Sequence, residues 1–235
     1  AALEARQEDV EFFSGMILVG NAADDTVVRA LNRDFYPMVL LEKSIKRMRL
    51  NTVCSDRVAG STVVTEHLIS LGLKNILIIS GEESETYDKE MLDELKAATK
   101  KSKGFESVNF TVARVPRAGE KFDFAQIENF LRPPHRCDAI IAVNSPLVFP
   151  LTIALQEKNI RIPQDVALVS MEDGIGFDLL STPITRLRKP LAAMSLKVAN
   201  IVWSEVKNQG KSKYKRQVTM APELVIRSSC GSYLK

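Results

Sequence analysis

Two short apolar runs, joined by a segment of helical character, dominate the centre of the chain. The first covers residues 139–143 and ends in Asn144; the second covers residues 166–169 and ends in Glu172. Apolar runs without alternation are typical of parallel strands that are covered on both faces, so the pattern predicts a βαβ unit. Ligands bind at the carboxyl ends of strands in such sheets, which makes Asn144 and Glu172 candidate ligand residues. An equally good alternative is that both cap a helix or a turn.

Similar patterns predict helices and strands along the rest of the chain. Asp24 or Asp25 is placed to cap a helix, and the helix expected at 192–206 carries Leu196, Ala199 and Val202 on one face, with Trp203 beside them as a core residue. The other expected helices cover residues 3–13, 61–71, 88–101 and 124–131, and the other expected strands cover 16–19, 38–41, 52–54, 75–80, 110–115, 187–190 and 224–226.

Composition limits the class of protein. With 235 residues, 45% of them hydrophobic, the chain is long enough for one large domain or two small lobes. A net charge of +3 is too small to indicate nucleic-acid binding by itself. Cys54, Cys137 and Cys230 form an odd set without CxxC spacing, which favours free thiols in a reducing, cytoplasmic compartment. No apolar run approaches the length of a membrane span, so no membrane partner is expected.

Four stretches, in order, carry a resemblance to a known family. They read VCSDRVAGSTVVTEHLISLGLKNILIISG, IRIPQDVALVS, LLSTPITRLRKP and MAPELVIRSSC. Together they resemble the effector-binding module of the lactose-repressor and galactose-repressor (LacI/GalR) family, over about residues 15–229. The resemblance implies an α/β, two-lobed, periplasmic-binding-protein-like type I fold with parallel sheets and helices on both faces. It also implies an amino-terminal lobe of residues 1–73 plus 189–210 and a carboxy-terminal lobe of residues 74–188 plus 211–235.

The chain departs from the family pattern in several places. The first strand and helix of the amino-terminal lobe, and the next strand, are not found before residue 3, which leads us to expect a longer natural protein. Met91 stands where the family usually has an arginine that grips a polar ligand, and Asp93 replaces a glycine. Ala118 occupies a loop position where an aromatic residue often contacts the ligand. These departures put a standard sugar or purine pocket in doubt.

The candidate ligand-binding residues come from several strand ends. The resemblance implies that Asp56 lies on a cleft wall, although a turn role is nearly as good an interpretation. Tyr87 offers a stacking face with a hydroxyl, or is simply a surface residue. His67 has no second ligand at metal spacing, so no metal and no cofactor are expected. The full predicted set is Asp56, Ser84, Tyr87, Asn144, Glu172 and Lys189.

The sequence carries no P-loop, GxSxG, HExxH or CxxC motif, so we do not expect an enzyme. The leading hypothesis is the sensing and dimerising module of a LacI-type transcription regulator. It would bind a small-molecule effector, such as a sugar or sugar derivative, and act as a homodimer. Operator DNA would be bound only by a helix-turn-helix head outside this chain. One alternative is a periplasmic solute-binding protein for transport or chemotaxis, and another is a regulator whose cleft has decayed and which responds to a partner protein.

Overall fold

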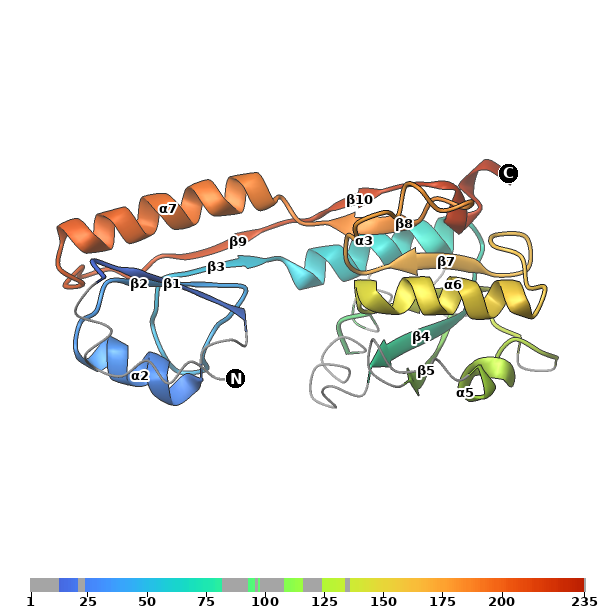
Figure 1. Ribbon diagram of the computed structural model, residues 1–235, viewed down its shortest axis with the longest axis horizontal. Helices are drawn as coiled ribbons and strands as arrows, with labels where there is room; N and C mark the ends of the chain where they lie inside the picture. Colours follow the sequence, from blue (N-terminus) through green and yellow to red (C-terminus); the bar gives the residue numbers. More distant parts are fainter. Residues whose placement is uncertain are drawn as a thin grey trace. The chain divides into compact units, whose positions relative to one another are not determined.

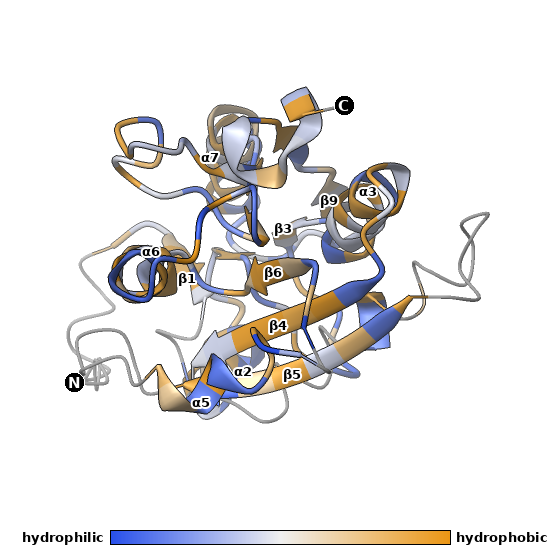
Figure 2. Ribbon diagram, turned by 90° about the vertical axis from the view of Figure 1, so that its right-hand side faces the viewer, coloured by the Kyte–Doolittle hydropathy of each residue, from blue (hydrophilic) through white to orange (hydrophobic). Residues whose placement is uncertain are grey.

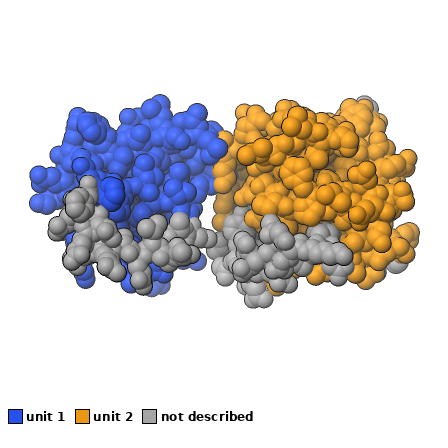
Figure 3. Space-filling view, viewed as in Figure 1, with its two compact units in different colours: residues 1–56, 190–221 blue, residues 57–189, 222–235 orange. Residues whose placement is uncertain are grey.

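The protein forms two compact units that each combine separate segments of the chain (Figure 3). One unit holds residues 1–56 and 190–221, and the other holds residues 57–189 and 222–235. The computed structural model describes residues 13–20, 24–81, 93–95, 97, 108–115, 124–133 and 136–234. Outside these residues lie nearly all of the helix expected at 3–13, most of the helix expected at 88–101, and Met91. Within the described residues, no helix is long and apolar enough to cross a membrane.

Unit 1 is built on a parallel sheet of four strands in the order β1-β2-β3-β9. The strands are β1 (Met16–Val19), β2 (Met38–Leu41), β3 (Thr52–Ser55) and β9 (Gln217–Met220). The first three confirm the strands expected from the apolar runs. The fourth was not expected, because its sequence alternates polar and apolar residues and follows a basic turn.

Both faces of this sheet are covered, as its apolar runs predict. Along β2, Met38 and Leu40 pack into a cluster with Val28 of α2 (Asp25–Arg33). Val39 points the other way and packs against α7 (Leu191–Lys207). Figure 1 shows α2 and α7 on opposite sides of the strands of unit 1. An uninterrupted hydrophobic strand sequence is therefore required here, since neither face of β2 meets water.

The helix α2 begins where the capping signal predicted it would. The side chain of Asp24 accepts a hydrogen bond from the backbone N–H of Thr26 at 2.6 Å. Asp25 stands in the first turn and Arg33 in the last, where each charge opposes the nearer end of the helix dipole. The local sequence thus fixes both ends of this helix.

The buried face of α7 differs from the one predicted. The structure buries Met194, Val198 and Ile201, whereas Leu196 is 65% exposed. Trp203, expected in the core, is 61% exposed. The helix carries apolar residues on two faces, so its periodicity could not show which face the sheet would cover. The strands β2 and β3 pack against the face that carries Met194, Val198 and Ile201.

Unit 2 contains a sheet of six strands in the order β10-β8-β7-β6-β4-β5. All neighbouring pairs are parallel except β10 with β8. The strands are β4 (Asn75–Gly81), β5 (Asn109–Val115), β6 (Ala139–Ala142), β7 (Ala167–Ser170), β8 (Thr185–Arg188) and β10 (Glu223–Val225). They confirm the predicted βαβ unit, with β8 beginning two residues earlier than expected.

Helices cover both faces of the second sheet. On one face, α3 (Arg57–Ser70) packs Val64 and Leu68 against Ile76 and Ile78 of β4. On the other face, α5 (Ala125–Glu128) and α6 (Val148–Glu157) contribute to a second cluster. Figure 2 shows the hydrophobic colouring of β4 and β6. The helix expected at 124–131 is thus only one turn long, and the one expected at 61–71 starts four residues earlier.

The division into units differs from the expected lobes in two segments, and Lys189, expected in the amino-terminal lobe, also belongs to unit 2. Residues 57–73 belong to unit 2, because α3 packs on β4. Residues 211–221 belong to unit 1, because β9 pairs with β3 over the register Thr52↔Gln217 to Ser55↔Met220. Both differences follow from which sheet each segment contacts.

Candidate functional site

Three of the predicted ligand residues lie at one edge of the sheet of unit 2. The register pairs Ala142 of β6 with Ser170 of β7. Asn144 and Glu172 each follow these paired residues by two positions, so the parallel strands place them side by side. Lys189 comes directly after β8, which runs parallel to β7. The carboxyl ends of β6, β7 and β8 therefore bring an amide, a carboxylate and an ammonium group to the same edge.

A backbone hydrogen bond links two of these positions. One oxygen of Glu172, Oε2, accepts a hydrogen bond from the backbone N–H of Ser145 at 3.0 Å. This N–H belongs to the first residue of η3 (Ser145–Leu147), so Glu172 does take the capping role that was considered as an alternative. Asn144 precedes η3 but its side chain makes no capping bond there. Among the described residues, the other oxygen of Glu172 has no hydrogen-bond partner, and it remains an acceptor for a ligand hydroxyl.

The remaining predicted residues are placed differently. Asp56 belongs to unit 1 and follows β3, where its backbone N–H donates to the carbonyl of Met220 at 2.8 Å and extends the β3–β9 ladder. It therefore stands at the carboxyl edge of its own sheet, and a site shared with Glu172 stays a prediction. Ser84, Tyr87 and Ala118 lie outside the described residues.

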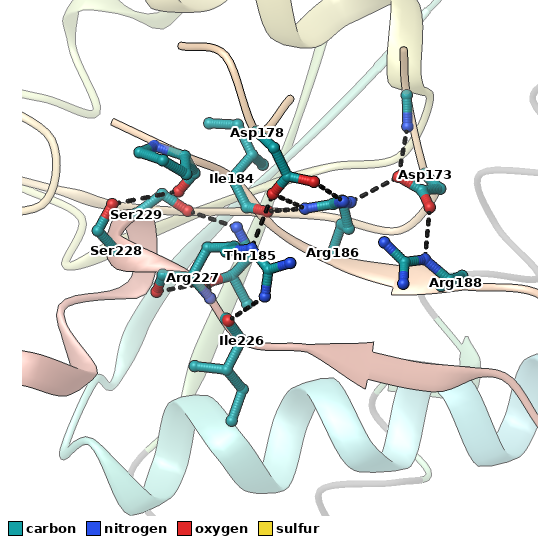
Figure 4. Close-up of polar contacts among 12 residues, drawn as sticks. Asp173, Asp178, Ile184, Thr185, Arg186, Arg188, Ile226, Arg227, Ser228 and Ser229 are labelled. Carbon is teal, nitrogen blue, oxygen red and sulfur yellow. Dashed lines mark hydrogen bonds and ion pairs between the residues drawn. The ribbon is translucent and has the colours of Figure 1, made fainter. Parts of the chain in front are cut away.

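Next to this edge lies an ion-pair network that the sequence reasoning did not find (Figure 4). Arg186 of β8 is almost fully buried, with a side chain 3% exposed. Its guanidinium donates to Asp178 at 2.7 Å and 3.0 Å, and to Asp173. Each carboxylate also accepts a hydrogen bond from a second arginine: Arg188 binds Asp173 at 2.8 Å, and Arg227 binds Asp178 at 2.7 Å. The result is a chain of five alternating charges.

The network keeps both carboxylates ionised. Partial burial by itself would raise the pKa of Asp173, but hydrogen bonds from Arg188 and Arg186 outweigh it and leave the pKa below its ordinary value. Hydrogen bonds from Arg186 and Arg227 hold the pKa of Asp178 well below its usual range. The pKa of Arg186 is raised, chiefly by its hydrogen bonds to Asp178. The negative charge of Asp173 is therefore already compensated by Arg186 and Arg188, which leaves Glu172 as the more available carboxylate of the acidic pair.

A signal for this network was present in the sequence. Arg186 and Arg188 are separated by one residue in a strand, so their side chains leave the same face of β8. The preceding loop supplies Asp173 and Asp178. Arg227 comes from a distant segment beyond β10, and no local pattern links it to the others.

The polar groups at this edge can bind a small polar molecule. Asn144 can both donate and accept hydrogen bonds, Glu172 accepts, and Lys189 donates, which matches the hydroxyl groups of a polar small molecule. In the described part of the chain, no group of three or more His, Cys, Asp or Glu residues is arranged to hold a metal ion.

Comparison with known families gives one match that covers most of the chain. Residues 65–230 match the family model described as "Periplasmic binding protein-like domain".

Two similar relatives are transcriptional regulators by name. The chain is 25% identical, over 202 residues, to the HTH-type transcriptional repressor PurR of Actinobacillus pleuropneumoniae serotype 3, covering 82% of this chain and 57% of the relative. It is 24% identical, over 194 residues, to the HTH-type transcriptional regulator DegA of Bacillus subtilis, covering 82% and 56%. The chain thus spans little more than half the length of these relatives.

The fold is also similar to solved structures. A LacI family transcriptional regulator from Enterococcus faecalis V583 with bound ribose superposes with a TM-score of 0.75 at 15% identity, covering 97% of this chain and 84% of that one. These similarities confirm the predicted α/β, periplasmic-binding-protein-like fold and the resemblance to LacI-type regulators.

Proposed function

Because the chain belongs to the family of periplasmic binding protein-like domains, we propose that it is the effector-sensing module of a LacI-type transcription regulator. In this proposal a small polar molecule, such as a sugar, binds against the carboxyl edge of the sheet of unit 2. Occupancy then changes the balance between two arrangements of the protein, to the extent that the ligand binds one arrangement more tightly than the other.

The observation that carries the proposal is the gathering of Asn144, Glu172 and Lys189 at the ends of adjacent strands. These polar groups lie at the edge where parallel sheets bind ligands. The names of the relatives support a regulator over a transport protein, since both relatives described above are HTH-type regulators. The same names support a protein that is not an enzyme and that acts on DNA in the cytoplasm.

We propose a pentose or a related sugar as the first ligand class to test, because a solved structure of similar fold carries bound ribose. A thermal-shift panel of sugars, sugar phosphates and nucleobases would be measured on the wild type. A ligand present at about 100 times its Kd stabilises the protein by about 2.7 kcal/mol, which such an assay detects readily.

The matched variants separate binding from folding. We expect Glu172→Ala and Asn144→Ala to abolish the ligand-induced shift, because each removes a hydrogen-bonding group from the edge. Glu157→Ala, which removes an exposed carboxylate at the end of α6, should leave the shift unchanged. Equal shifts in all four proteins would show that the ligand binds elsewhere.

The proposal includes operator binding through a helix-turn-helix head that is not among these residues. It follows that the present chain should not bind an operator specifically. A mobility-shift assay of this chain with operator fragments would test that point, and sequence-specific binding would contradict it.

We further propose that the module is a homodimer and that an apolar face of unit 2 contributes to the contact. Ile175 is 99% exposed and Leu179 is 89% exposed, and both lie in the loop after β7. Ile153 and Phe149 of α6 are 56% and 38% exposed, and the Phe149 ring lies 5.8 Å from that of Phe177 in the same loop. A contiguous group of exposed, large hydrophobic side chains is typical of an interaction surface.

Light scattering would test the dimer. Leu179→Asp should raise the monomer fraction, because it places a charge in the proposed contact. Leu196→Asp makes the same change on the exposed face of α7 and should have no effect. If both variants behave alike, the contact does not involve the loop after β7.

A further inference from the structure

Unit 1 contains a hollow that the proposed effector function does not use. It has a volume of about 370 Å³ and lies where β2, β3 and β9 begin. Its walls come from the turn after α2, the segment before β3 and the loop that joins α7 to β9. The residues that matter for its chemistry are Phe35, Tyr36, Arg49, Lys211, Lys213 and Lys215.

The hollow is strongly basic. Four of the described residues that line it are cationic, and its described lining includes no aspartate or glutamate. Lys215 is already engaged, because its Nζ donates to Glu205 at 2.8 Å and to the carbonyl of Gly210 at 3.0 Å. Arg49, Lys211 and Lys213 are exposed and pair with no carboxylate among the described residues. Three uncompensated cations around one hollow create a positive potential that favours an anion.

The backbone that carries these cations is held in place. Gly210 has a φ of +69°, and a Cβ there would lie 1.6 Å from the carbonyl oxygen of Phe35, so the two loops are in direct contact. Asn51 accepts a hydrogen bond from the backbone N–H of Arg216 at 2.9 Å, which ties the end of the basic loop to the start of β3. Such a scaffold reduces the ordering that a ligand would have to impose on binding.

The hollow is separate from the predicted effector edge of its own unit. The three strands β2, β3 and β9 run parallel, so their amino ends lie at one edge of the sheet and Asp56 lies at the other. A strand of four residues spans about 13 Å at roughly 3.3 Å per residue. A ligand in the hollow therefore contacts a different set of residues from a ligand bound beside Asp56.

We infer that this hollow is a second binding site, for a small phosphorylated molecule. Arg49, Lys211 and Lys213 would bind the phosphate oxygens with charge-assisted hydrogen bonds. Phe35, which is 58% exposed, offers an apolar surface for the organic part of the ligand. The volume lies within the range of small-molecule pockets and accommodates a sugar phosphate.

Calorimetric titration of the full chain with ribose 5-phosphate, pyrophosphate and free ribose tests the site. We expect the two phosphorylated probes to bind wild type and Lys211→Gln/Lys213→Gln to raise their Kd by at least about tenfold, since each charged hydrogen bond lost accounts for about a factor of ten or more. The control Lys74→Gln/Lys197→Gln removes two exposed lysines elsewhere and should change the Kd by less than about twofold.

Three outcomes would overturn the assignment. No binding of pyrophosphate to the wild type would show that the hollow holds no phosphate. Equal weakening by the two double variants would show that overall charge, and not the hollow, attracts the anion. Loss of pyrophosphate binding in Glu172→Ala would place the phosphate at the effector edge of unit 2. Failure of the effector proposal alone leaves pyrophosphate binding intact, so the two proposals are tested independently.

Discussion

Replacing Arg186 with methionine is expected to destabilise unit 2 by about 3 kcal/mol. The substitution removes the hydrogen bonds that the buried guanidinium donates to Asp173, Asp178 and the carbonyl of Ile184. Hydrogen bonds to charged groups contribute about 1.5–3 kcal/mol each, but the desolvation of Arg186 itself offsets much of this sum. The loss stays moderate because Arg188 and Arg227 still neutralise the two carboxylates.

The effect can be measured by thermal and urea unfolding. For a protein of this size, about 3 kcal/mol lowers the Tm by about 6–12 °C. Arg188→Met provides the control: its side chain is 42% exposed and donates one short hydrogen bond, so it should cost less than about 1 kcal/mol. Arg186→Lys should recover only part of the loss, because an ammonium cannot form the two parallel bonds to Asp178.

The pH dependence gives a second, independent check. The folded-state pKa values of Asp173 and Asp178 are depressed below the ordinary value of 3.8. The stability that the network contributes is therefore fully present above about pH 4 and is lost as the pH falls through the lower folded-state values. The difference between wild type and Arg186→Met should be constant from pH 7 to about pH 5 and shrink below about pH 4. A difference that grows on acidification, or a variant as stable as the wild type, would refute the reasoning.

Three further predictions concern other parts of the molecule. Gly210→Ala should lower the free energy of unfolding of unit 1 by more than about 2 kcal/mol, because the added Cβ meets the Phe35 carbonyl and the positive φ disfavours alanine; an unchanged midpoint in urea unfolding would contradict the close contact. His67→Ala should raise the thiol pKa of Cys230, which is about 6 because the raising effect of burial is outweighed by hydrogen bonds with His67, at 3.3 Å, and with Thr185 and Ser232 together; the Cβ chemical shift of Cys230 during a pH titration reports it, and an unmoved titration would exclude the pairing. Ser80→Ala should be neutral or stabilising by up to about 1 kcal/mol, because its buried hydroxyl has no partner among the described residues; a loss larger than about 1 kcal/mol in urea unfolding would reveal a bond to another group.

Much of the fold could be predicted from the sequence because strands buried on both faces leave a simple signal. The run at 139–142 is apolar throughout, and it forms β6 with every residue buried. The strand β9 could not be found in this way, because its residues alternate and only Val218 and Met220 pack against the core cluster that α7 shares with the sheet. The packing face of α7 was mispredicted for a related reason, since periodicity identifies an apolar face but not the surface that covers it.

The candidate site was only partly predictable. Asn144 and Glu172 were found because strand ends mark the ligand edge of a parallel sheet, and the register of β6 with β7 brings them together. The pairing of Asp178 with Arg227 spans 49 positions in the sequence, so only the fold reveals it. Likewise, Arg49 and Lys211 line the hollow of unit 1 from two separate loops, and the sequence of neither loop predicts the hollow by itself.

The discontinuous composition of the two units has a consequence for biosynthesis. Residues 190–221 supply α7 and β9 to unit 1, so the surface of Val39 and Val53 that α7 covers stays bare until the ribosome has passed that point. The segment 57–189 emerges earlier and can assemble most of its own sheet in the meantime, lacking only β10. Translation should therefore complete unit 1 late, although its first strands leave the exit tunnel first. For the same reason, a nick between residues 56 and 57 would divide unit 1 between two fragments and leave every segment of unit 2 in one of them, and dissection of the protein into its units requires rejoining distant segments by a linker.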